Sequence, residues 1–145
     1  MSIITKWTMH SMLCGAMILI AVHDLHASGK EIASGRSHGL TASIANDSGR
    51  FVAGSNDFCA VFTKTPNAAP VSVKDVTVEF AQQVGRIRER SIHAQITEVN
   101  LGDFCGKVDL GTQYYRPAFY YVFIHYIDAT GARRKCHLSF VIKQE

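Results

Sequence analysis

Two stretches near the end of the chain decide the fold: FYYVFIHYI at residues 119–127 and CHLSFVI at residues 136–142. In the second stretch apolar and polar residues alternate, which is typical of a strand with one buried face. The first stretch is apolar on both faces and predicts a central, packed strand. Because the turn-forming residues DATG at 128–131 lie between them, the two stretches predict a β-hairpin.

Similar short strands recur upstream of this hairpin. They are expected at residues 40–45, 51–53, 58–62, 76–80, 92–97 and 104–110, with turn residues between them. Residues 84–90 are expected to form a polar connection. We therefore predict an all-β fold over residues 40–145, an immunoglobulin-like sandwich of seven or eight antiparallel strands.

The length, composition and net charge of the chain exclude several classes of protein. The chain has 145 residues, the length of one domain, with 47% hydrophobic and 19% charged residues. These fractions argue against a disordered acidic chain and against a coiled coil. The formal net charge of +3 is too small to indicate nucleic acid binding.

Residues 1–27 resemble a secretory signal peptide, a helix that is removed on export. Lys6 supplies the positive start, residues 12–22 an apolar run, and Ala27 a small residue at the expected cut. The alternative is an uncleaved membrane anchor, which would be the only membrane contact. Residues 28–39 are rich in Gly, Ser and Ala and predict a flexible tether. The mature protein is therefore expected to be periplasmic or secreted.

Three cysteines follow the leader: Cys59, Cys105 and Cys136. Strand phase turns Cys59 and Cys105 outward and Cys136 inward. In an immunoglobulin-like order the strands of Cys59 and Cys105 are neighbours, so we predict a Cys59–Cys105 disulfide. The cysteines are 46 residues apart (105 minus 59), and such a bond stabilises by about 4 kcal/mol. Pairing of either one with Cys136, or no bond, remains an alternative.

The residues offer little for catalysis or for metal binding. Cys136 and His137 are adjacent on a strand and point to opposite faces, so they cannot form a dyad. His125 and His137, on the two arms of the final hairpin, are weak metal candidates. We expect Ile127 to pair with Ala132, a register that does not make these histidines direct neighbours. We therefore predict no enzyme, no bound metal and no cofactor.

Tyr114, Tyr115 and Arg116 form the most unusual polar and aromatic stretch, just before the central strand. Tyrosine and arginine are enriched at the energetic centres of protein interfaces. These three residues are therefore a candidate contact patch.

The order of the elements resembles the YtkA-like and FixH-like family of exported β-sandwich domains. The matching features are the segments GSNDF at 54–58, PV at 70–71 leading to VTV at 76–78, GDFCGKVDL at 102–110, and DATG at 128–131. The resemblance covers roughly residues 40–142, and some family members are linked to copper or to oxidase assembly. This chain departs from the pattern by having three cysteines and no methionine after the leader, and methionine is a preferred Cu(I) ligand.

Together these observations predict an exported, non-catalytic interaction or structural module of the cell envelope. Its expected partner is another envelope protein and not nucleic acid. The alternative, which the resemblance implies, is a periplasmic, copper-related metal-handling domain of the YtkA/FixH type.

Overall fold

The computed structural model describes residues 29–84, 87–111 and 118–142, and it describes side chains in these ranges except at 84–90. The described residues form eight strands and no helix. The strands are β1 (Lys30–Ser37), β2 (Leu40–Asn46), β3 (Ser55–Lys64), β4 (Lys74–Val84), β5 (Ile87–Asn100), β6 (Asp103–Asp109), β7 (Ala118–Ile127) and β8 (Arg133–Ile142). The prediction of an all-β fold is confirmed.

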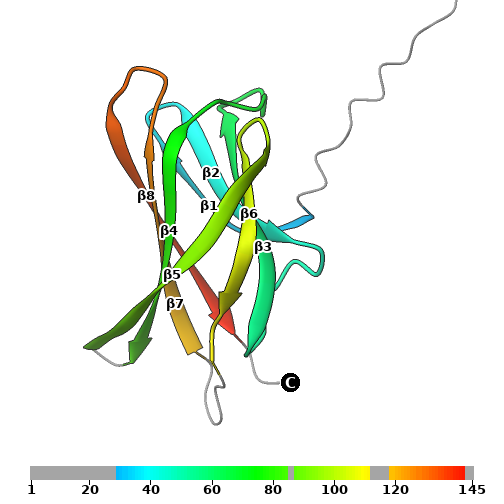
Figure 1. Cartoon of the computed structure of the whole chain (residues 1–145), viewed down its shortest axis with the longest axis vertical. Coiled ribbons are helices and arrows are strands. Elements are labelled where there is room, and N and C mark those ends of the chain that lie inside the picture. The colour runs from blue at the N-terminus through cyan, green and yellow to red at the C-terminus, as the bar shows by residue number, and fades with distance from the viewer. Residues whose placement is uncertain (1–28, 85–86, 112–117, 143–145) are drawn as a thin grey trace, which may run out of the picture.

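All strand pairs are antiparallel, and they form one sheet in the order β1-β2-β3-β6-β5-β4-β7-β8 (Figure 1). With β1 set aside, β2-β3-β6-β5 and β4-β7-β8 follow the order of the two sheets in an immunoglobulin constant-type domain. The long hairpin of β4 and β5 joins these two halves. The sheet bends until β1 reaches β8, where a Cβ on Gly35 would lie only 2.9 Å from the Cys136 sulfur.

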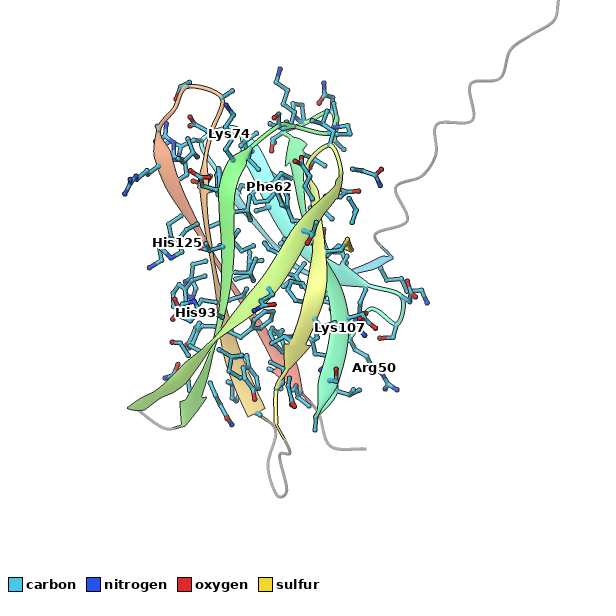
Figure 2. The ribbon with its side chains drawn as sticks, in the orientation of Figure 1. Arg50, Phe62, Lys74, His93, Lys107 and His125 are labelled. Atoms are coloured by element: carbon cyan, nitrogen blue, oxygen red, sulfur yellow. A yellow bond between two sulfur atoms is a disulfide. The ribbon has the colours of Figure 1, made fainter. Side chains whose placement is uncertain are left out.

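The core lies between the two halves and is rich in aromatic rings. Phe58 and Phe80 meet edge to face with ring centroids 5.2 Å apart, and Phe62 meets Tyr126 at 5.0 Å. Figure 2 shows Phe62 between the two halves. Edge-to-face contacts between rings are favourable beyond their buried area, so this core fixes how the halves pack.

The predicted tether is wrong for residues 30–37, which form β1 and pair with β2. A two-residue turn joins the strands, and its residues His38 and Gly39 have φ values of 50° and 76°. Positive φ at both positions gives a turn that matches the strand twist. The Gly- and Ser-rich composition concealed this strand because β1 is an edge strand with little apolar side chain to bury. The leader, residues 1–27, lies outside the described residues.

The expected polar connection at 84–90 is also largely wrong. Strand β4 continues to Val84 and β5 already begins at Ile87, so only residues 85–86 link them. Residues 85–86 themselves lie outside the described part of the chain. An antiparallel strand with one face toward solvent can be as polar as a loop, so polarity alone suggested a loop here.

The register expected for the final hairpin is wrong by one residue. Ile127 pairs with Arg133, and not with Ala132. The Asp128 carboxylate accepts hydrogen bonds from the backbone N–H groups of Thr130 at 2.9 Å and Ala132 at 3.1 Å. The Asp128 N–H also donates to the Ala132 carbonyl at 3.0 Å. These bonds retain Ala132 in the loop, so pairing starts one residue later.

Candidate functional site

The most distinctive surface is the outer side of β7 and β8. Along both strands every second side chain is buried in the core, and the intervening ones point outward. We call the outward set the aromatic–basic face; it comprises Phe119, Tyr121, Phe123, His125, Ile127, Arg133, Lys135, His137, Ser139 and Val141.

The register gives this face a direction. Phe119 lies opposite Val141 at one end, where the two residues are 57% and 39% exposed. At the other end, beside the β7–β8 loop, His125 lies opposite Lys135, and the next outward residue of β8 is Arg133. The face is therefore apolar at one end and cationic at the other.

A stack of rings occupies the middle. The rings of Phe123 and His137 are nearly parallel at 7°, with centroids 5.0 Å apart. The Tyr121 ring completes the cluster, with its centroid 5.0 Å from that of His137 and 6.5 Å from that of Phe123. The Lys135 ammonium lies 4.5 Å from the Phe123 centroid, within range of a cation–π contact. These contacts order the side chains without a ligand, which lowers the entropy cost of binding.

Strand β4 supplies the acidic and small neighbours of the face. Glu79 pairs in register with Phe123, and the small Ala81 beside Tyr121 is fully buried. Asp75 lies in a bulge with a φ of 50° and lines a pocket of about 260 Å³ together with His125 and Arg133. Asp75 and Glu79 are therefore the described carboxylates that border this face.

Arg134 is not part of the basic end, because it is already paired. Its Nε donates to the Asp128 Oδ2 at 2.7 Å, and Thr130 donates its hydroxyl to the Oδ1 of the same carboxylate. The Thr130 hydroxyl, followed by Arg134, holds the pKa of Asp128 well below its usual range. This ionised carboxylate fixes the loop, so Arg133 and Lys135 remain as the outward cations.

The predicted disulfide is present: Cys59 on β3 and Cys105 on β6 are direct cross-strand partners with their Cα atoms 4.0 Å apart. The bond lies on the outer side of this half, as strand phase predicted. Cys136 is a free thiol in the core, and burial raises its pKa. A structural disulfide fits an oxidising, extracytoplasmic compartment.

The histidines do not converge on a metal. His125 lies opposite Lys135 in the register, and His137 packs against the rings of Tyr121 and Phe123. Among residues 29–84, 87–111 and 118–142 no group of three or more His, Cys, Asp or Glu side chains is arranged to hold a metal ion. No observation therefore favours the metal-handling alternative. Tyr114, Tyr115 and Arg116 lie outside the described residues.

Sequence reasoning missed two features. The sequence suggested that residues 119–127 are packed on both faces, although Phe119 is exposed. The outward residues of the partner strand β8 are mostly polar, and they could have indicated that this side of the sheet is open to solvent. The second feature is a G-x-S-x-G motif at residues 35–39, in which the Ser37 hydroxyl lies 2.8 Å from the His38 Nδ1. In hydrolases this motif joins a strand to a helix, whereas here it joins β1 to β2.

No protein-family model matches the chain, and no curated protein and no solved structure matches it either. The described residues include no helix that is long and apolar enough to span a membrane.

Proposed function

We propose that this protein is an exported, non-catalytic binding domain of the cell envelope that contacts another protein through the aromatic–basic face. The observation that carries the proposal is the exposed pair Phe119 and Val141 next to an ordered ring stack. Contiguous apolar surface bordered by charges marks interaction sites, and aromatic residues dominate binding energy there. Val99 and Leu101 are about as exposed, but they flank the β5–β6 turn instead of a sheet face.

The direction of the face defines the chemistry of the partner. Its basic end has Arg133 and Lys135, and the described carboxylates beside it are Asp75 and Glu79. A complementary segment has apolar side chains at one end and carboxylates at the other. Such complementarity fixes the orientation of a partner and accelerates its association.

A second copy of the same face does not meet this requirement. Whichever way two copies are turned, Arg133 and Lys135 of one copy meet the same cations or the apolar end of the other. Like charges meet in the first arrangement, which is costly at an interface, and the cations face apolar side chains in the second. An acidic and apolar segment of a different protein is therefore the preferred occupant.

Export is supported by independent features of the chain. The disulfide fits an oxidising compartment, and the apolar run at residues 12–22 follows the signal peptide pattern. The resemblance to YtkA-like and FixH-like domains points to the same periplasmic or secreted location.

Binding is tested on the disulfide-bonded full chain with a labelled peptide that has a block of glutamates followed by alternating leucine and serine. Fluorescence anisotropy gives the affinity for the wild type, Phe119→Ser and Lys135→Glu. The matched control is Lys107→Glu, because the Lys107 side chain is 76% exposed and lies on the opposite side of the molecule from His125 (Figure 2). We expect each face variant to weaken binding about tenfold and the control to leave it unchanged.

Two further probes separate other classes of ligand. Phosphatidylglycerol vesicles test a lipid surface, and a chito-oligosaccharide tests a glycan. Stronger binding of either probe than of the peptide contradicts the proposal. Equal losses in Lys107→Glu and Lys135→Glu also contradict it, because attraction would then follow net charge and not the face.

A further inference from the structure

The Cys59–Cys105 bond lies at the surface, on a different part of the sheet from the aromatic–basic face. Both cysteines are half-buried, whereas Phe58 and Ala60, which flank Cys59, point into the core. Two surface pockets meet at the bond. One, of about 480 Å³, is lined by both cysteines and by the β2–β3 connection. The other, of about 590 Å³, reaches Cys105 from the side of β5.

Whether a reductant can reach the sulfur atoms determines whether a disulfide can be reduced in the folded protein. Reduction begins when a thiolate attacks one of the two sulfurs, so the rate depends on whether a reductant can reach it. A bond buried between two sheets is reached only after the domain opens. A bond at the meeting point of two open pockets can be attacked while the domain stays folded.

We propose that Cys59–Cys105 is a thiol–disulfide exchange site of the folded domain, and that its co-reactant is a dithiol. A thiolate of the dithiol attacks the Cys59 sulfur, the S–S bond breaks, and its electron pair leaves on Cys105. The second thiol of the reductant then attacks its partner sulfur in the mixed disulfide and releases Cys59. Two electrons and two protons pass to the protein, which gains two thiols, and the dithiol becomes a disulfide.

The charges beside the bond select Cys105 as the leaving sulfur. Lys107 follows two residues after Cys105 on the same outer side of β6 and lines both pockets. Asp57 precedes Cys59 by two residues, and its Oδ1 is 3.6 Å from the Lys107 Nζ. A nearby ammonium stabilises a thiolate, whereas a nearby carboxylate disfavours one. The negative charge of the first step is therefore better placed on Cys105.

Backbone pairing on both sides of the bond is expected to keep β3 and β6 in place after the bond is reduced. Strands β3 and β6 pair in register from Ser55–Asp109 to Val61–Asp103. Each also has a second neighbour, because β2 pairs with β3 and β5 pairs with β6. The reduced cysteines are therefore held opposite each other, and the disulfide form of the dithiol can close the bond again by the reverse exchange.

The test uses the full chain purified in its oxidised form, with dithiothreitol as the probe. Reduction is followed by alkylation and peptide mass mapping in urea concentrations below the unfolding transition. Buried Cys136 is an internal control, because its alkylation reports opening of the core. We expect Cys59 and Cys105 to become alkylated at a rate independent of urea, at least tenfold faster than Cys136. Rates that rise with urea in parallel with Cys136 would show that reduction needs unfolding and would overturn the proposal.

A second measurement tests the charges. Lys107→Gln is expected to slow reduction a few-fold, whereas the control Lys64→Gln, an exposed lysine at the far end of β3, is expected to leave the rate unchanged. Asp47 and Asp57 line the Cys59 pocket, so cationic cysteamine should react faster than anionic mercaptoethanesulfonate. Equal rates for the two lysine variants would contradict Cys105 as the leaving sulfur, and equal rates for the two thiols would contradict attack on Cys59 through its acidic pocket.

Discussion

The outer sides of the β3–β6 pair and of the β7–β8 pair lie in different halves of the sheet, and different interactions join their cross-strand partners. On β3–β6 the outward partners Cys59 and Cys105 share a covalent bond beside the ion pair of Asp57 and Lys107. On β7–β8 the outward partners Phe123 and His137 are in contact through stacked rings, and the Lys135 ammonium lies over the Phe123 ring. A cross-strand pair can thus link two strands covalently or form part of a binding surface, depending on its side chains.

The largest expected effect is loss of the covalent pair. Replacing Cys59 and Cys105 together by alanine should lower the free energy of unfolding by about 4 kcal/mol, because the unfolded chain regains the entropy of a 46-residue loop. Urea denaturation of the oxidised wild type and the double variant measures this. Replacing Cys136 by alanine removes no bond and serves as the reference; its cost is that of one small buried side chain. Equal midpoints for the wild type and the double variant would mean that the bond contributes nothing to stability.

A smaller effect is expected at the stacked pair. A double-mutant cycle of Phe123→Ala and His137→Ala should give a coupling energy of about 1 kcal/mol, the usual value for a ring pair. Denaturation of the two single variants and the double variant provides it. A cycle of Phe119→Ala and His137→Ala is the control, because Phe119 lies opposite Val141 instead. Equal coupling energies in the two cycles would mean that ring stacking between Phe123 and His137 adds no stability of its own.

The smallest expected effect is a change of stability at acidic pH, and it arises in the loop that joins β7 to β8. Hydrogen bonds from Thr130 and Arg134 lower the pKa of folded Asp128, so the ionised form stabilises the folded state at pH values above about 4, the unfolded pKa. This contribution disappears as the pH falls through the lower folded value. Asp128→Asn should therefore melt below the wild type at neutral pH, and the difference should shrink toward pH 2. A melting difference that stays constant over this pH range would argue against an ionised Asp128.

Much of the fold and one covalent feature could be predicted from the sequence. Alternating residues such as Val76, Val78 and Phe80 marked strands, and strand phase correctly placed Cys59 and Cys105 outward. The hairpin register failed because it depends on hydrogen bonds of a single side chain, that of Asp128, and not on hydrophobic alternation. Strand β1 was missed because edge strands need few apolar residues.

The candidate site was harder to predict for a similar reason. Alternation tells that Phe119, Tyr121 and Phe123 share one side of a strand, but not whether that side is covered. The prediction of core packing for this stretch assumed that apolar residues are covered, whereas a sheet face is covered only if another layer packs on it. The candidate patch at residues 114–116 lies outside the described residues and stays a prediction.

The sequence by itself determined the local properties of this protein: the all-β class and the inward and outward phase of its strands, including the outward phase of Cys59 and Cys105. These follow from the two-residue period of a strand, which the backbone imposes wherever the chain is extended. Only the tertiary structure decided that no described strand packs on the outer side of β7 and β8 and that the residues there are ordered from apolar to cationic. That arrangement depends on cross-strand register and on which elements pack against a face, which are properties of neighbours distant in the chain.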